Sequence, residues 1–148
     1  MTVMTGGRMT ALLDTYQRPV SNLRISLNAG CNLRCIYCHR EGECRPEEPL
    51  PLEDLKEIFT VAQNLGIRSI KLTGGEPLLR KDIIDVIGAI PKEIESSITT
   101  NGTLLKDLAD DLKKAGLSRV NISLDSLRPE TYQKITSVPL LQEVLQGI

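Results

Sequence analysis

Three cysteines lie close together in a C-x3-C-x2-C arrangement, at Cys31, Cys35 and Cys38. Their thiolates are near enough along the chain to converge on a single inorganic centre. A structural zinc site takes four ligands, usually as paired C-x2-C elements. An iron–sulfur cubane held by three cysteines instead leaves one iron open to a substrate or cofactor. The number and spacing of the cysteines therefore favour a centre that does chemistry.

A closed metal site is the structural alternative. Cys44, or His39 beside Cys38, could complete a zinc site of four thiolates, or of three thiolates and an imidazole. Each of these two residues also has an ordinary interpretation, Cys44 as an uninvolved thiol and His39 as a polar loop residue. On spacing alone both kinds of metal centre remain open.

The composition is that of a globular domain, since 41% of the 148 residues are hydrophobic and 25% are charged. The 18 Lys and Arg residues nearly cancel the 19 Asp and Glu residues. Neither sign forms a long block, so we expect no nucleic-acid partner and no anionic membrane. No apolar run approaches the roughly 20 residues of a membrane span, and residues 1–10 have no signal core. A cytoplasmic protein is expected, in which cysteines bind metal or act in catalysis.

Short β-rich segments alternate with longer amphipathic ones. Strands are predicted at residues 23–27, 69–73, 96–100 and 119–124. Helices are predicted from 52 to a cap at Gly66, from 83 to a stop at Pro91, over 104–115 with a cap at Gly116, and from 129. This alternation predicts parallel strands joined by right-handed crossovers, hence an α/β barrel or a doubly wound sheet. About four βα units are present.

The polar and glycine-rich segments fall where the predicted strands end. The cysteine loop follows the first strand, and the other three strands end in Thr73-Gly-Gly-Glu-Pro77, Thr99-Thr-Asn-Gly102 and Ser123-Leu-Asp-Ser126. Because catalytic faces of α/β folds lie at the carboxyl ends of strands, we expect all four segments on one rim. Asn101 and Asp125 are candidates for supporting contacts there. Taken alone, the Thr-Gly-Gly-Glu-Pro segment also fits a simple strand-to-helix turn.

The cysteine loop, with Tyr37 before its last cysteine, and the Gly74-Gly-Glu-Pro77 segment together resemble the radical S-adenosylmethionine (SAM) superfamily. Within it the chain is most similar to the GTP 3',8-cyclase family of molybdenum cofactor biosynthesis. That similarity runs from about residue 14 to 136 and rests on Asp14-x-Tyr-x-Arg-Pro-Val20, Leu23-Arg-Ile-Ser26, Thr73-Gly-Gly-Glu-Pro-Leu-Leu-Arg80, Thr99-Thr-Asn-Gly102 and Val120-Asn-Ile-Ser-Leu-Asp-Ser-Leu127. The fold it implies is a partial TIM-like (βα) barrel of the radical SAM type.

The resemblance implies a [4Fe–4S] cluster on the three cysteines Cys31, Cys35 and Cys38, with its fourth iron bound to SAM. An electron passed to the sulfonium would release a 5'-deoxyadenosyl radical, chemistry that the cofactors supply and the protein orients. The residues that the resemblance places around SAM are Tyr37 near the adenosyl group, the backbone of Gly74 and Gly75 near the methionyl part, Glu76 as an acceptor for the ammonium group, and Ser123.

The same resemblance implies GTP as substrate, contacted by Arg24, Lys71 and Thr99, a cyclic pterin precursor as product, and an electron donor for the cluster as partner. Strand alternation turns Arg24 and Lys71 away from their apolar neighbours and into the barrel interior. A triphosphate there would supply the anion that two such cations require. Without the resemblance, solvent-facing positions on an edge strand explain both residues equally well.

The family also carries a second iron–sulfur cluster near its C-terminus, and no cysteine follows Cys44 here. We therefore divide the chain into an N-terminal lead, residues 1–22, and an incomplete radical SAM core domain, residues 23–148. The expectation is a truncated cyclase that does not complete the reaction alone. Two alternatives stay open. Another radical SAM enzyme, peptide-modifying or activating, need not keep the GTP residues, and a zinc-binding α/β module would ignore SAM.

Overall fold

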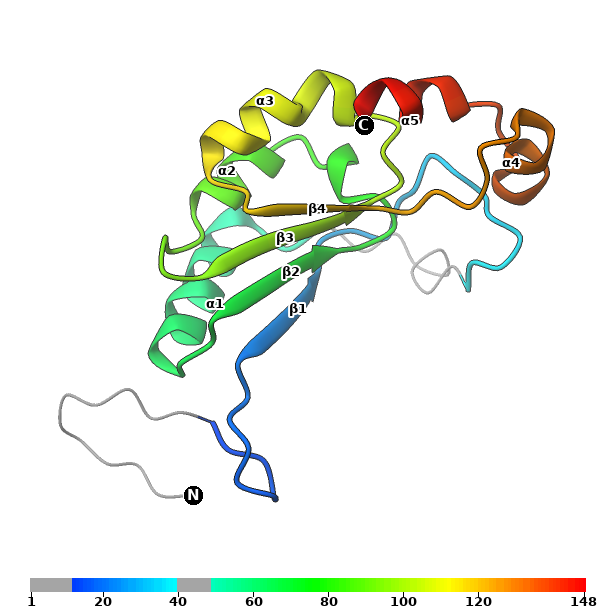
Figure 1. The fold of residues 1–148 in the computed structure, drawn as a ribbon. Helices are drawn as coiled ribbons and strands as arrows, with labels where there is room; N and C mark the ends of the chain where they lie inside the picture. Colours follow the sequence, from blue (N-terminus) through cyan, green and yellow to red (C-terminus); the bar gives the residue numbers. More distant parts are fainter. Residues whose placement is uncertain (1–11, 40–48) are drawn as a thin grey trace, which may run out of the picture.

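The computed structural model describes residues 12–39 and 49–148, so Cys44 lies outside the described residues. Within them the chain forms a parallel sheet of four strands in the order β1-β2-β3-β4 (Figure 1). The strands are β1 (Asn22–Ser26), β2 (Ser69–Thr73), β3 (Glu95–Thr100) and β4 (Arg119–Ile122). Between and after them lie α1 (Leu52–Asn64), the 3-10 turn η1 (Pro77–Leu79), α2 (Ile83–Gly88), α3 (Leu105–Ala115), α4 (Pro129–Thr136) and α5 (Leu141–Gly147).

Helices α1, α2 and α3 cover one face of the sheet and leave the other face open (Figure 1). The covered face is apolar: Ile70, Leu72 and Ile98 of the strands are fully buried in one core with Leu55 and Phe59 of α1. Burial of such side chains contributes about 1.5–3 kcal/mol each. The alternating strand positions therefore face the other way, which leaves the polar side chains of β1 to β4 on the open face.

The predicted α/β fold with parallel strands is confirmed, and most element boundaries differ by one or two residues. Gly66 and Gly116 follow α1 and α3 with φ of 79° and 103°, the left-handed conformation that suits a glycine at a helix end. The fourth strand ends at Ile122, two residues before the predicted end. Only the Ser123 N–H still reaches β3, donating to the Thr100 carbonyl at 2.9 Å, before the chain turns away.

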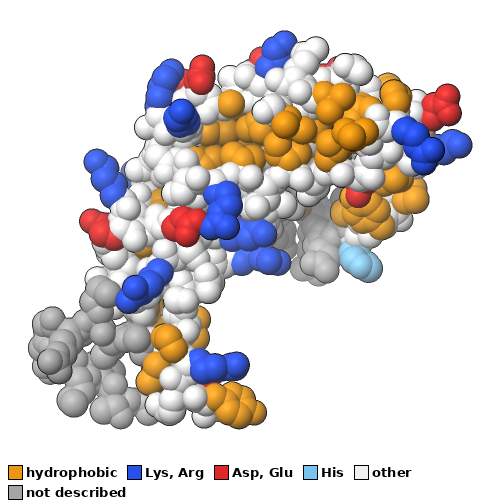
Figure 2. Space-filling view, in the orientation of Figure 1, with side chains coloured by type: hydrophobic (Ala, Val, Ile, Leu, Met, Phe, Trp, Pro, Cys, Tyr) orange, Lys and Arg blue, Asp and Glu red, His pale blue; other side chains and the backbone are white. Residues whose placement is uncertain are grey.

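The strand β4 is an edge of the described sheet and is bordered by apolar surface. Figure 2 shows a band of hydrophobic side chains above the strand on the side of α3 and α5. Val120, Leu145 and Ile148 are among the exposed apolar residues of these segments. None of the helices formed by residues 12–39 and 49–148 is long and apolar enough to cross a membrane.

Candidate functional site

The cysteine loop begins directly after β1, at the carboxyl end of the sheet. Cys31, Cys35 and Cys38 are free thiols; the first and last are exposed and the middle one is half-buried. A tight turn joins the last two, with the Cys38 N–H donating to the Cys35 carbonyl at 3.0 Å. The Leu33 N–H points at the sulfur of Cys31, 3.4 Å away. The loop thus presents three thiols at the rim where the sequence predicted them.

The surroundings of Cys35 act on its thiol. Desolvation is the first cause that raises the pKa of Cys35, and the charges of Asp125, Cys31 and Cys38 raise it further, against a hydrogen bond with Tyr37 that lowers it. These surroundings therefore disfavour a thiolate at Cys35. Metal ions bind thiolates and remove that penalty.

The far side of the cysteine loop is fixed to the end of α4, about a hundred residues later in the chain. Arg34 N–H donates to the Thr136 carbonyl at 3.0 Å, and Ile36 N–H donates to the Ile135 carbonyl at 2.9 Å. The hydroxyl of Ser137 donates back to the Arg34 carbonyl at 2.9 Å. These bonds hold the loop backbone between its cysteines, so α4 has a role at the site that sequence analysis missed.

The glycine pair after β2 packs against the loop that carries the cysteines. Gly75 N–H donates to the Asn28 carbonyl and Glu76 N–H to the Gly30 carbonyl, both at 2.8 Å. A Cβ on Gly75 would lie 2.3 Å from the carbonyl oxygens of Ala29 and Gly30, and one on Gly74, where φ is +154°, 2.4 Å from Asn28 Oδ1. The glycines are therefore required by the contact between the two loops, a reason that sequence analysis missed.

The side chain of Glu76 is fully buried beneath this turn. Its Oε1 accepts from the Thr100 hydroxyl at 2.7 Å and from Leu78 N–H at 2.9 Å, and its Oε2 accepts from Asn101 N–H at 2.7 Å. Desolvation raises the pKa of this carboxyl, while the three hydrogen bonds oppose the rise. The resemblance placed this carboxylate on the ammonium group of SAM. In the structure the carboxylate instead binds three donors of the protein and has no surface open to a ligand.

Asn101, predicted as a supporting residue, lies directly behind the first cysteine. Its Nδ2 donates to Asn32 Oδ1 at 2.8 Å and to the sulfur of Cys31 at 3.8 Å. Asn32 in turn donates to the hydroxyl of Thr103 at 2.9 Å, and that hydroxyl donates to Asn101 Oδ1 at 2.7 Å. Asn32 and Thr103 were missed in the sequence, where only their places beside Cys31 and Asn101 pointed to them.

Tyr37 and Asp125 join the cysteine loop to the end of β4. The tyrosine hydroxyl donates to Asp125 Oδ2 at 2.8 Å. Desolvation first, and this hydrogen bond second, raise the pKa of Tyr37 well above its ordinary value, so the hydroxyl stays protonated and remains a donor. Tyr37 as a whole is 56% exposed, which leaves it open to a ligand. Ser123, also exposed, lies two residues before Asp125 at the same rim.

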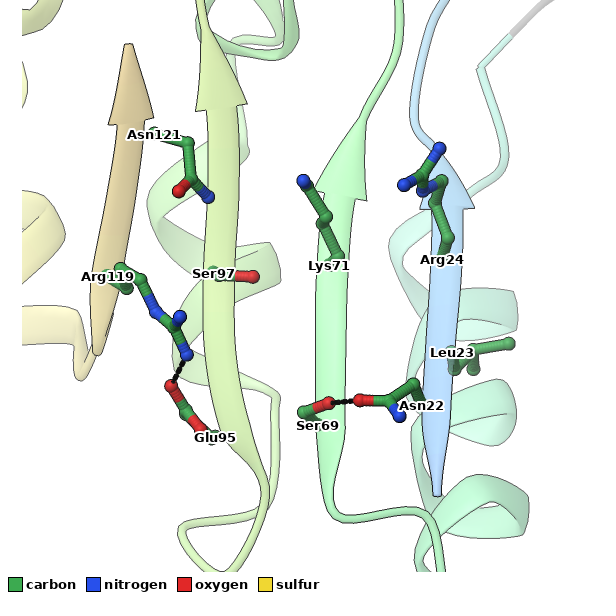
Figure 3. Close-up of a pocket in the computed structure, with 9 residues that line it drawn as sticks. All are labelled: Asn22, Leu23, Arg24, Ser69, Lys71, Glu95, Ser97, Arg119 and Asn121. Atoms are coloured by element: carbon green, nitrogen blue, oxygen red, sulfur yellow. Dashed lines mark hydrogen bonds and ion pairs between the residues drawn. The ribbon is translucent and has the colours of Figure 1, made fainter. Parts of the chain in front are cut away.

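The open face of the sheet carries a hollow of about 390 Å³ lined by polar and charged side chains from all four strands. Arg24 and Lys71 are direct neighbours in the β1–β2 register, and both side chains extend towards the carboxyl ends of their strands (Figure 3). Arg119 is ion-paired with Glu95. Arg24 and Lys71 thus share the open face of the sheet. The remaining lining residues are Asn22, Leu23, Ser69, Ser97 and Asn121.

Thr99 lies on β3, two residues beyond Ser97 of the hollow and in register with Asn121. Its hydroxyl oxygen is buried without a hydrogen-bond partner among the described residues. A buried hydroxyl without a partner costs about 1–3 kcal/mol.

His39 lies exposed at the end of the described part of the loop. Across residues 12–39 and 49–148, no three Cys, His, Asp or Glu side chains lie close enough together to hold one metal ion. A cubane is larger than a single ion, and its ligands lie correspondingly further apart.

The sequence from residue 25 to 148 matches the family model described as "Radical SAM superfamily". The chain belongs to the radical SAM superfamily. Members use a [4Fe–4S] cluster and SAM, and the predicted recognition and cofactors are confirmed at that level. The residues at the rim fit a cluster, because they supply three free thiols on one loop and an amide N–H aimed at the sulfur of Cys31.

Curated relatives that carry the name "Probable GTP 3',8-cyclase" are about half identical to the chain. The protein of Pyrococcus abyssi is 51% identical over 138 residues, which make up 93% of this chain and 45% of the relative. That of Thermococcus kodakarensis is 52% identical over 139 residues, again 93% and 45%. The chain thus spans about 45% of the length of these relatives.

Solved radical SAM structures share the fold. Streptococcus suis SuiB bound to S-adenosylmethionine is 26% identical with a TM-score of 0.67, and covers 82% of this chain and 28% of its own. The structure of anSMEcpe with bound AdoMet has a TM-score of 0.72 at 23% identity, over 86% of this chain and 39% of its own. These neighbours are consistent with the predicted partial TIM-like barrel.

Proposed function

We propose that residues 1–148 form the cluster-binding and SAM-binding part of a GTP 3',8-cyclase. Cys31, Cys35 and Cys38 would hold the [4Fe–4S] cluster and would leave one iron open to SAM. When bound and reduced, the cluster supplies the electron that cleaves SAM to methionine and a 5'-deoxyadenosyl radical. A low-potential one-electron donor is the partner that this chemistry requires.

For SAM we propose contacts with the open ring of Tyr37, the backbone of Gly74 and Gly75, and the exposed Ser123. Tyr37 is supported by its exposed ring and by the bond to Asp125, which holds the ring at the rim. Glu76 would act through the turn that its buried carboxylate fixes, and not by direct contact with the SAM ammonium.

The pairing of Arg24 with Lys71 on the open face of the sheet carries the proposal for GTP. Two neighbouring cations in one hollow repel each other unless an anion lies between or above them, and a triphosphate can bind both. Thr99, two residues beyond Ser97 on the same strand, would then complete the contact from β3. The identity of about 51% to proteins named as probable GTP 3',8-cyclases supports this substrate over a peptide.

Two assays on the anaerobically reconstituted chain test this function. Dithionite and SAM should yield 5'-deoxyadenosine, and the Cys35→Ala variant should yield none. Equilibrium dialysis should then show binding of GTP to the reconstituted chain, weakened by removing either cation. SAM cleavage without any GTP binding would overturn the assignment of the nucleotide site to the open face of the sheet, and the absence of both would overturn the whole proposal.

A further inference from the structure

We propose that Asn101 is a positioning residue for the cluster, which sets its reduction potential through a hydrogen bond to the sulfur of Cys31. The proposal rests on the proposed cluster site and adds to it a residue outside the cysteine loop. Asn101 is nearly buried, with 9% of its surface exposed, and its Nδ2 lies 3.8 Å from Cys31 Sγ.

A closed ring of hydrogen bonds fixes the direction of this amide. Asn101 donates to Asn32, Asn32 donates to the Thr103 hydroxyl, and that hydroxyl donates back to Asn101 Oδ1. The backbone N–H of Thr103 also donates to Asn101 Oδ1, at 3.0 Å. Two donors therefore meet the oxygen of the amide, so its nitrogen must point the other way, towards Asn32 and Cys31.

The amide nitrogen has two hydrogens, and the ring uses one of them. Asn32 Oδ1 accepts the first, which leaves the second for the cysteine sulfur. The backbone of Asn101 is held independently, since its N–H donates to the buried Glu76 carboxylate at 2.7 Å. The donor at Cys31 is thus fixed from two sides, by the ring and by the turn after β2.

A hydrogen bond to a ligating sulfur stabilises negative charge on that sulfur. A reduced cluster carries one more negative charge than an oxidised one, so the bond stabilises the reduced form more and raises the reduction potential. A fixed donor does this without reorganisation when the electron arrives. Asn101 would therefore make the cluster easier to reduce by its electron donor.

The test is a redox titration of the reconstituted chain without SAM, in which the EPR signal of the reduced cluster is measured at each potential. Asn101→Asp removes the donor and places a carboxylate beside Cys31. We expect the equilibrium constant for reduction of the cluster to fall about tenfold. For a one-electron couple this moves the midpoint potential about 59 mV to the negative. Asn64→Asp makes the same change on the exposed end of α1, at the other end of the sheet, and should leave the midpoint unchanged.

A second pair of variants separates the hydrogen bond from the added charge. Thr103→Val opens the ring without introducing a charge. We expect it to shift the midpoint potential in the same direction, with about a threefold fall in the equilibrium constant for reduction. Thr103→Ser keeps the hydroxyl and should restore the wild-type value. This pair also decides the question if Asn101→Asp fails to fold or to bind iron.

The outcomes distinguish this inference from the function on which it rests. If the variants keep their iron and sulfide and the midpoints of Asn101→Asp and Thr103→Val equal the wild-type value, Asn101 has no tuning role and the cluster site stands. If the wild-type chain binds no cubane, the proposed cluster site and the proposed role of Asn101 are both wrong.

Discussion

The carboxylate of Glu76 accepts the hydroxyl hydrogen of Thr100 at 2.7 Å, which joins the segment after β2 to the end of β3. The same carboxylate holds the N–H groups of Leu78 and Asn101. One buried side chain thus determines both the shape of the glycine-rich turn and the place of the residue behind Cys31.

Replacing this carboxylate by an amide should destabilise the protein. In Glu76→Gln the amide oxygen can still accept from Thr100 and Leu78. The amide nitrogen then faces the N–H of Asn101, and because both groups are donors no hydrogen bond forms between them. We expect the free energy of unfolding to fall by about 1–3 kcal/mol, the cost of a buried donor without a partner. Urea denaturation at pH 7 measures it. Glu57→Gln, on the exposed side of α1, should change it by less than about 0.5 kcal/mol. Equal stabilities of the two variants would contradict the role of Glu76.

A methyl group on Gly75 should displace the cysteine loop. The added Cβ would lie 2.3 Å from two backbone oxygens, which cannot move as a flexible side chain would. Gly75→Ala should therefore lose most of the iron that the wild-type chain binds on reconstitution. Gly88→Ala is the matched control, since no atom lies within 4 Å of its added Cβ and helix α2 should gain up to about 1 kcal/mol. Full iron content in Gly75→Ala would refute this account of the glycine.

The pair Arg80 and Asp82 predicts a dependence of stability on pH. The buried guanidinium donates to both oxygens of Asp82, at 2.6 and 2.9 Å, and to the carbonyl of Leu50 at 2.7 Å. Hydrogen bonds from Arg80 are the first cause that holds the pKa of Asp82 below its ordinary value of 3.8. The stability that Asp82 contributes is therefore present above about pH 3.8, and it is lost as the pH falls through the lower folded-state pKa.

Asp82→Asn should lower the free energy of unfolding at pH 7 by about 1–3 kcal/mol, a range reduced because Asp82 is partly exposed. The difference from wild type should shrink as the pH is lowered below 3.8. Thermal unfolding between pH 2.5 and 7 measures both quantities, with the exposed Asp110→Asn as the control. A difference that stayed constant over this range would show that the ion pair does not stabilise the fold.

Removing either cation of the open face should weaken GTP binding. A charge-assisted hydrogen bond contributes about 1.5–3 kcal/mol, so Arg24→Ala and Lys71→Ala should each raise the Kd for GTP by about tenfold to a hundredfold. Equilibrium dialysis with the reconstituted chain measures this, and SAM cleavage should persist in both variants. Arg68→Ala removes an exposed arginine outside the hollow and should leave the Kd unchanged. Equal affinities in all three variants would exclude the hollow as the nucleotide site.

Much of the fold could be predicted because its signals are local. Alternation in β2 and the 3.6-residue period in α1 place Leu72 and Phe59 in the core, where both are fully buried. The ends of elements depend on partners far along the chain. Strand β4 ends at Ile122 because β3, its only neighbour in the described sheet, ends at Thr100, and this cannot be read from residues 119–124 alone.

The rim residues could be predicted from their places at strand ends, but their contacts could not. The resemblance places the backbone of Gly75 near SAM, but the sequence does not show that an added Cβ would meet Ala29 and Gly30 of the neighbouring loop. Glu76 suggested a ligand contact, whereas its side chain is turned inwards by three donors from segments up to 25 residues away. The sequence does not reveal these contacts because they join segments that lie far apart along the chain.

The central claim is that Cys31, Cys35 and Cys38 hold a [4Fe–4S] cluster. Iron, acid-labile sulfide and zinc should be measured per chain after anaerobic reconstitution, in the wild type and in Cys35→Ala. We expect about four irons and four sulfides in the wild type and loss of both in the variant. About one zinc without sulfide would contradict the claim and leave a structural metal loop on an α/β scaffold.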